Sequence, residues 1–168
     1  MSIIVNTTVI STLAAIGQLD LLRRVYGMVH ISSEVMEEIE AGLDEGYQFY
    51  AGIQQWVYPL VNTGWIRLSS LSGEAEIQLC ARLPRQLHKG EASSLAIAQQ
   101  RGWLFLTDDR RARQEARRLE VALSGTLGTL VLAVERHICS ADQAESWLAA
   151  MRRNGYRSPV ASLASLIK

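Results

Sequence analysis

The run WLFLTDD, from Trp103 to Asp109, joins a short apolar segment to two adjacent carboxylates. An apolar block of this length predicts a strand buried in a parallel sheet. The carboxyl ends of parallel strands open onto the crevice where ligands bind, so Asp108 and Asp109 are placed to hold a cation. The alternative is that one aspartate only caps the following helix, RRARQEARRLE, because Asp is a favoured N-cap residue.

A second strand is expected at residues 3–5, IIV, which are β-branched and apolar. The strand stops at Asn6, and a helix-like pattern begins close behind it. If the two strands belong to one parallel sheet, Asn6 and the Asp108, Asp109 pair share one edge of that sheet. An amide oxygen such as that of Asn6 is itself a ligand for hard cations.

Glu91 is a further acidic candidate, because it stands in the first turn of a predicted helix, GEASSLAIAQQRG, whose other residues are mostly small or apolar. A buried acid requires a partner, which is a base, a hydrogen-bond donor or a metal. The structural alternative is the helix dipole, which stabilises an acid at this position by about 0.3 to 1 kcal/mol.

The acidic helix from Glu34 to Glu40 supplies two more candidates. Its apolar face consists of Val35, Met36 and Ile39. At 100° per residue, Glu38 and Glu40 border that face on opposite sides, while Glu37 points to solvent. Spacing alone does not choose between Glu38 and Glu40, and a solvated helix face explains most such charge runs.

Cationic side chains that could bind a substrate are expected on the arginine-rich helix that starts beside the aspartate pair. Arg110, Arg113 and Arg117 recur at helical spacing along one side of it, and arginine matches phosphate geometry with two donors. Grooves of this kind hold single-stranded nucleic acid. The alternative is that these arginines pair with Glu115 and Glu120 on a solvated face.

Composition fits one domain spanning residues 1–168 with a substantial core, since 48% of the residues are apolar. The chain carries 17 basic and 17 acidic side chains, so its total charge points to neither nucleic acid nor a membrane. Cys80 and Cys139 lack metal-ligand or disulfide spacing. No signal peptide and no segment of the roughly 20 apolar residues that span a bilayer is evident, so a cytoplasmic protein is expected.

Alternating apolar runs and helical patterns predict an α/β protein with a mostly parallel sheet. Helices are expected at 8–16, 19–26, 34–42, 72–84, 90–102, 110–120 and 125–137, followed by two more, and further strands at 28–31, 65–70 and 121–123. The first of the last two helices opens at Ser140. In SGTLGTL, the glycines are expected to serve a turn and close helix packing, because the lysine of a phosphate-binding loop is missing.

Taken in order, several segments resemble the PIN domain of prokaryotic toxin-type proteins. The segments are VNTTVIS, VMEEIE, GEASSLAIA, LTDDRRAR and VALSGTLGTL. The resemblance runs from about Ile3 to the end of the chain, and residues 43–88 form a divergent stretch within it. It implies a compact three-layer α/β/α sandwich, helix-rich and with a mostly parallel central sheet, an acidic cluster holding Mg²⁺ or Mn²⁺, and endoribonuclease activity.

Carried over to this chain, the acidic positions of the family fall on Glu38, Glu91, Asp108 and Asp109. The resemblance thus selects Glu38 over Glu40. Where most members have an Asp after the first strand, this chain has Asn6, which removes one negative charge from the implied site. The implied metal ligands are Asn6, Glu38, Glu91, Asp108 and Asp109.

The leading hypothesis is therefore a metal-dependent, toxin-like ribonuclease with an RNA substrate and a cognate antitoxin protein. The second is a degenerate relative that binds RNA or protein without cutting, motivated by Asn6 and the neutral total charge. An aspartyl phosphatase is disfavoured, because Asn6 cannot act as the nucleophile. Apolar helices at both ends also predict a homodimer, although core packing would use the same residues.

Overall fold

A computed structural model describes all 168 residues and contains a six-stranded sheet in which every pairing is parallel. The strands are β1 (Ile3–Val5), β2 (Val29–Ser32), β3 (Val57–Tyr58), β4 (Ile66–Ser69), β5 (Leu104–Leu106) and β6 (Leu123–Ser124). Their order across the sheet is β3-β4-β2-β1-β5-β6. Adjacent β1 and β5 confirm that the two apolar runs with polar ends are neighbouring strands.

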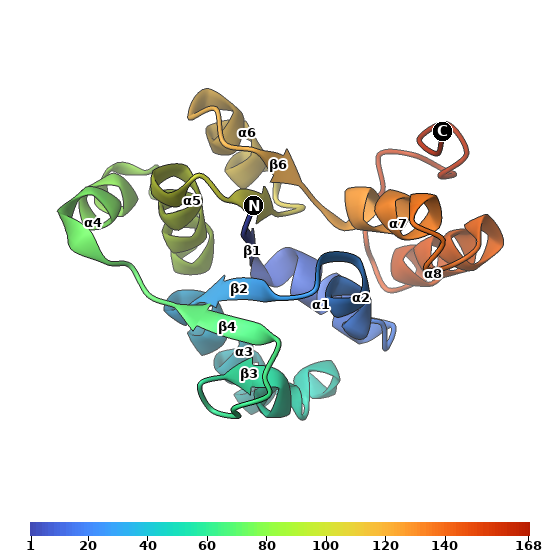
Figure 1. Ribbon diagram of the computed structural model, residues 1–168, viewed down its shortest axis with the longest axis horizontal. Coiled ribbons are helices and arrows are strands. Elements are labelled where there is room, and N and C mark those ends of the chain that lie inside the picture. The colour runs from blue at the N-terminus through green and yellow to red at the C-terminus, as the bar shows by residue number, and fades with distance from the viewer.

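Helices cover both faces of the sheet, which confirms the predicted three-layer α/β/α architecture (Figure 1). The α-helices are α1 (Thr7–Ala15), α2 (Asp20–Tyr26), α3 (Ser33–Asp44), α4 (Gly73–Arg82), α5 (Lys89–Arg101), α6 (Arg110–Arg118), α7 (Thr126–Glu135) and α8 (Ala141–Arg153). Two short 3-10 helices, η1 (Gln48–Tyr50) and η2 (Ile53–Trp56), lie within the divergent stretch 43–88, which also supplies β3, β4 and α4.

The core is divided in two by the sheet, as the side-chain alternation of β1 shows. Ile3 and Val5 belong to a cluster of 25 buried residues shared with α1, α2, α3, α7 and α8. Ile4 points to the opposite face and joins Phe105 in a cluster of 10 buried residues that includes α5 and α6. Burial on both faces explains why β1 and β5 are continuously apolar.

The strands that follow β1 in the sequence lie on both sides of it in the sheet. From β1 the chain adds β2 and β4 on one side, and β5 and β6 follow on the other side of β1. Val5 pairs with Leu106, and the backbone N–H of Asn6 donates to the Leu106 carbonyl at 2.9 Å. This pairing confirms that Asn6 and the aspartate pair share one edge of the sheet, at the switch point where α/β proteins bind ligands.

Most of the predicted helix ends and caps are confirmed. α4 ends two residues before Pro84, and α5 ends at Gly102, which has a φ of 67°. Ser140 caps α8 by accepting a hydrogen bond from the Gln143 N–H at 3.0 Å. The apolar stripe of α8 packs inside the chain, with Leu148 1% exposed, so it gives no separate support to the predicted homodimer.

One helix end was predicted wrongly. The helix expected to stop at Gly42 continues to Asp44, because Gly42 serves packing rather than termination. A Cβ on Gly42 would lie 2.8 Å from Cε2 of Tyr50, so the missing side chain lets the Tyr50 ring rest on α3. Similarly, the last strand lies at Leu123–Ser124 and not at residues 121–123, because it pairs with Phe105 and Leu106.

The second of the two predicted C-terminal helices does not form. Residues 154–168 follow turns, starting at Gly155 with a φ of 95°. Pro159 lacks the N–H that a helical hydrogen bond would need. The Glu145 carboxylate holds the tail in its place by accepting hydrogen bonds from the hydroxyl of Ser162 and the N–H of Leu163, both at 2.6 Å. This tail closes over α8 and reaches the region of α7. No helix of the protein has the length and apolar character that crossing a bilayer requires.

Candidate active site

Acidic side chains from three helices approach the carboxyl ends of β1 and β5. Glu38 comes from α3, Glu91 from α5, and Asp109 from the start of α6. The pKa of Glu91 is raised mainly by burial, and the negative charges of Asp109 and Glu38 raise it further. Three of the sequence-predicted acids are therefore close enough to interact electrostatically.

Glu38 is fixed by hydrogen bonds to two neighbouring elements. Its Oε1 accepts from the N–H of Gly90 at 2.8 Å, and its Oε2 accepts from the hydroxyl of Thr7 at 2.5 Å. A Cβ on Gly90 would lie 2.7 Å from both carboxylate oxygens, so only glycine lets Glu38 sit on the first turn of α5. Glu40 is exposed. The geometry thus favours Glu38, the choice that helical spacing left open.

Glu91 has a structural and an electrostatic role at the same time. It is only 4% exposed, and its Oε2 accepts from the N–H of His88 at 2.9 Å in the capping box of α5. This hydrogen bond and the charge of His88 lower the pKa of Glu91, but burial and the two neighbouring acids outweigh them. A cation among these carboxylates would relieve their repulsion.

The two aspartates of the LTDD run point to different places. Asp109 caps α6, with its Oδ1 accepting from the N–H of Ala112 at 2.8 Å. Asp108 caps α7, because its Oδ1 accepts from the Thr126 N–H at 2.9 Å and its Oδ2 from the Thr126 hydroxyl. Burial raises the pKa of Asp108, while the Thr126 hydrogen bonds and the charge of Arg113 lower it. Of the two aspartates, Asp109 is the one whose charge raises the pKa of Glu91.

Asn6 connects the ends of the two central strands. It is 1% exposed, its Oδ1 accepts from the Thr7 N–H at 2.6 Å, and its Nδ2 donates to the hydroxyl of Thr107 at 2.8 Å. Thr107 in turn accepts from the N–H of Asp109 at 3.2 Å. No pattern in the sequence indicates the roles of Thr7 and Gly90, because their shared partner, Glu38, is distant along the chain.

The donor set fits a hard divalent cation, although no three Asp, Glu, His or Cys side chains form a closed set of ligands. Glu91 and Asp109 each keep one carboxylate oxygen free of hydrogen bonds to protein. Mg²⁺ retains several waters and commonly takes only one or two carboxylates from the protein. Glu91 and Asp109 could therefore hold the ion directly, with Glu38 and Asn6 facing its water ligands.

A cleft of about 580 Å³ is lined by Asp108 and Asp109, while Glu38 and Glu91 lie outside its lining. One wall is formed by Thr8, Ser11 and Thr12 of α1 together with Phe49 of η1. The other is formed by Asp108, Asp109 and Arg110, and by Met151 and residues 154–157 at the end of the chain. Phe49 is 39% exposed and stacks on Tyr47 with 5.7 Å between ring centroids, so a flat aromatic face lines the cleft.

The parallel α/β/α sandwich and the acidic edge of its sheet define a small domain of the nuclease type. The chain belongs to the PIN domain family, whose sequence pattern it matches over residues 2–168. This match confirms the PIN domain family, and PIN domains are generally nucleases that use divalent metals. No functionally curated protein shows significant sequence similarity to the chain.

Replacing Gly90 by Ala tests the contact between the Glu38 carboxylate and the first turn of α5. Ala is favoured over Gly in a helix by about 1 kcal/mol, so Gly90→Ala should stabilise a Glu38→Ala background by about this amount. With Glu38 present, the new Cβ displaces its carboxylate and removes a hydrogen bond worth about 1 kcal/mol, so the gain should vanish. Urea unfolding of the four proteins measures this coupling, and equal gains in both backgrounds would contradict it.

Proposed function

We propose that the protein is a metal-dependent endoribonuclease that hydrolyses phosphodiester bonds of single-stranded RNA with Mg²⁺ or Mn²⁺. The observation that carries the proposal is the placement of Glu38, Glu91 and Asp109 at the switch point of a PIN fold, where Glu38 contacts the residue before Glu91 and Glu91 and Asp109 each cap a helix. The charges of Asp109 and Glu38 also raise the pKa of Glu91. Burying like charges together is costly unless a cation compensates them. RNA as the substrate is supported by the sequence resemblance.

Each side chain of the site has a distinct task in this proposal. The divalent ion, when bound, supplies an activated water and neutralises charge on the phosphoryl oxygens. Glu91 and Asp109 bind the ion, because each offers a free oxygen and is held in place by a helix-capping hydrogen bond. Glu38, held by Thr7 and Gly90, orients the attacking water and accepts its proton.

The substrate cleft has features suited to a single strand. Arg110 and Arg157 line it without any side-chain carboxylate partner, so their guanidinium groups are available to phosphate. Phe49 offers a face on which an unpaired base can stack. Asp108 belongs in this scheme to the capping of α7, which positions the strand-end loop.

A toxin-like role with a cognate antitoxin protein is the part of the proposal that rests on the sequence resemblance. A second candidate function is a PIN domain that binds RNA or protein without cutting it. This candidate is favoured by Asn6, which lowers the negative charge of the site, and by Glu38, whose two oxygens already accept hydrogen bonds.

The first test is Mn²⁺-dependent cleavage of a labelled single-stranded oligoribonucleotide, followed by gel electrophoresis. Glu91→Gln and Asp109→Asn should each lower the rate by roughly a hundredfold or more, the usual cost of losing a group that stabilises the transition state. Glu37→Gln is the matched control, because Glu37 is an exposed acid on α3. A matched DNA strand checks that the substrate is RNA.

Thermal unfolding supplies a readout that does not depend on activity. Mn²⁺ should raise the melting temperature of the wild-type protein, because a ligand that binds the folded state stabilises it. The rise should be smaller for Glu91→Gln, which lacks one of the two proposed metal ligands. Stabilisation by Mn²⁺ without any cleavage of RNA would favour the non-catalytic candidate. Cleavage that persists in EDTA would contradict a metal-dependent reaction.

Asn6→Asp should strengthen metal binding. The substitution restores a negative charge at the edge of the sheet, and two unit charges 4 Å apart interact by about 4 kcal/mol at an effective dielectric of 20. We expect Mn²⁺ affinity, measured by titration calorimetry, to rise at least about tenfold. Unchanged affinity would show that Asn6 does not face the ion or its water ligands.

Phe49→Ala should weaken binding of single-stranded RNA by about 1 to 3 kcal/mol, the contribution of one base stacked on an aromatic ring. Phe49→Tyr retains a stacking face and should bind nearly as well as the wild type. Leu60→Ala is the control, since Leu60 is 57% exposed and does not line the cleft. Fluorescence anisotropy measures the three affinities, and equal binding by all of them would remove Phe49 from the substrate path.

A further inference from the structure

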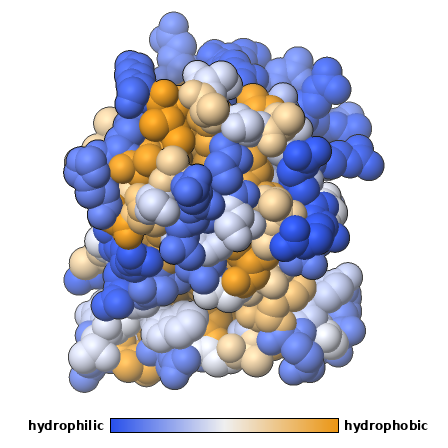
Figure 2. Space-filling model, turned by 90° about the vertical axis from the view of Figure 1, so that its right-hand side faces the viewer, coloured by the Kyte–Doolittle hydropathy of each residue, from blue (hydrophilic) through white to orange (hydrophobic).

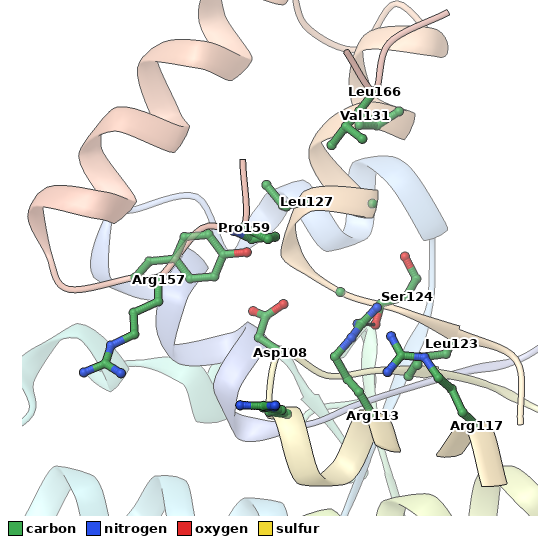
Figure 3. A pocket seen from close by; sticks show the side chains of 14 residues that line it. Asp108, Arg113, Arg117, Leu123, Ser124, Leu127, Val131, Arg157, Pro159 and Leu166 are labelled. Atoms are coloured by element: carbon green, nitrogen blue, oxygen red, sulfur yellow. Dashed lines mark hydrogen bonds between the residues drawn. The ribbon is translucent and has the colours of Figure 1, made fainter. Parts of the chain in front are cut away.

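A second and larger pocket lies on the far side of Asp108 from the acidic cluster. Its volume is about 890 Å³, and it is bounded by α6, by the start of α7 and by the C-terminal tail (Figure 3). A space of this size is in the range of small-molecule and cofactor sites. Neither the capping roles of the strand-end residues nor the proposed metal site accounts for it.

Four arginines surround this pocket, namely Arg110, Arg113, Arg117 and Arg157. Arg113 is already engaged, because its Nη1 donates to the carbonyls of Thr107 at 2.8 Å and Ser124 at 3.1 Å. Arg110, Arg117 and Arg157 are exposed and have no carboxylate partner, contrary to the alternative that pairs them with neighbouring acids. The one α6 arginine that does pair is Arg118, with Glu115 at 2.8 Å.

The opposite wall of the pocket is apolar. Leu127 and Val131 project from α7, and Pro159 and Leu166 face them from the C-terminal tail (Figure 3). The surface formed by α7, α8 and this tail shows apolar patches interrupted by hydrophilic groups (Figure 2). A ligand of this pocket therefore requires an anionic part for the arginines and a flat or apolar part for α7.

The start of α7 is not the anion-binding element. The Thr126 N–H donates to Asp108, and a Cβ on Gly125 would lie only 2.5 Å from Asp108 Oδ1. Asp108 therefore already occupies the helix N-terminus and adds negative charge to the floor of the pocket. An anionic ligand must lie further out, on the side of the pocket where Arg117 lies (Figure 3).

The pocket adjoins the proposed substrate cleft. Asp108, Arg110, Tyr156 and Arg157 line both of them. A strand whose reacting phosphate lies at Glu91 and Asp109 would pass Arg110 and Arg157 and enter this space. This shared wall favours a further part of the same polymer over an unrelated small anion as the ligand.

We propose that the pocket binds a nucleotide of the RNA strand that flanks the cleaved bond, with its phosphate held by Arg117. Its base lies against Leu127 and Val131. The inference rests on the proposed function only for the identity of the ligand as RNA. An acidic peptide is the competing occupant, and it would use the same arginines without any dependence on the length of an RNA strand.

The test measures binding in EDTA, where metal-dependent cleavage does not occur. Anisotropy titrations use end-labelled single-stranded oligoribonucleotides of increasing length, extended from either end. We expect affinity to step up once the strand is long enough to enter the pocket. Arg117→Ala should remove this step, lowering affinity for the long strands about tenfold, the scale of one charge-assisted hydrogen bond, while short strands bind unchanged. Arg117→Lys should restore part of the step.

Arg118→Ala is the matched control, because it removes the same charge from the next residue but outside the pocket. Leu127→Trp fills the pocket without changing charge and should also remove the step, with circular dichroism melting to verify folding. Equal weakening by Arg117→Ala and Arg118→Ala at every length would overturn the proposal, as would retention of the step in Leu127→Trp.

The two proposals fail independently in these experiments. A length step that depends on Arg117, in a protein that cleaves no RNA, would retain the nucleotide pocket and reject the nuclease. Metal-dependent cleavage with binding that ignores Arg117 and Leu127 would retain the nuclease and reject the pocket as its subsite. In that case, a labelled acidic peptide that binds the wild type and no longer binds Arg117→Ala identifies the competing occupant.

Discussion

The pairing of β1 with β5 is the constraint on which the candidate site depends. Three consecutive residues of β1 pair with β5, and the N–H of Asn6 continues the ladder to Leu106. This fixes the start of α1 beside the start of α6, so that Thr7 can hold Glu38 while Thr107 holds Asn6 and Asp109. Slipping the pairing by one residue would turn the buried strand side chains to the wrong face of the sheet.

Each of the four acids at this edge accepts a hydrogen bond from a backbone N–H at the start of a helix. The donors are Gly90 to Glu38, His88 to Glu91, Ala112 to Asp109 and Thr126 to Asp108. Unpaired N–H groups at helix N-termini favour negative charge. Capping and cation binding are therefore compatible roles for Glu91 and Asp109, since each keeps a second carboxylate oxygen free.

Much of the fold follows from patterns that are local in sequence. The buried strands at residues 3–5 and 104–106 and the ends of α4 and α5 were predictable because apolar runs, Pro84 and Gly102 act on their immediate neighbours. Gly42 and the C-terminal tail were not, because a distant Tyr50 and Glu145 decide their conformation. For the same reason the sequence placed the acids at one edge but could not distinguish the directions of Asp108 and Asp109.

The different directions of Asp108 and Asp109 separate acidic from basic side chains on the surface. Successive residues after a strand leave it in different directions, so Asp109 turns to the acidic cluster and Asp108 to the floor of the arginine-lined pocket. Acids that favour a cation and arginines that favour phosphate are thereby kept on two sides of one loop. A nucleic-acid strand is attracted by local fields of this kind within a Debye length of about 8 to 10 Å. The equal numbers of acidic and basic residues are therefore compatible with the proposed RNA substrate, because separation of charge, and not its total, sets the field in the cleft.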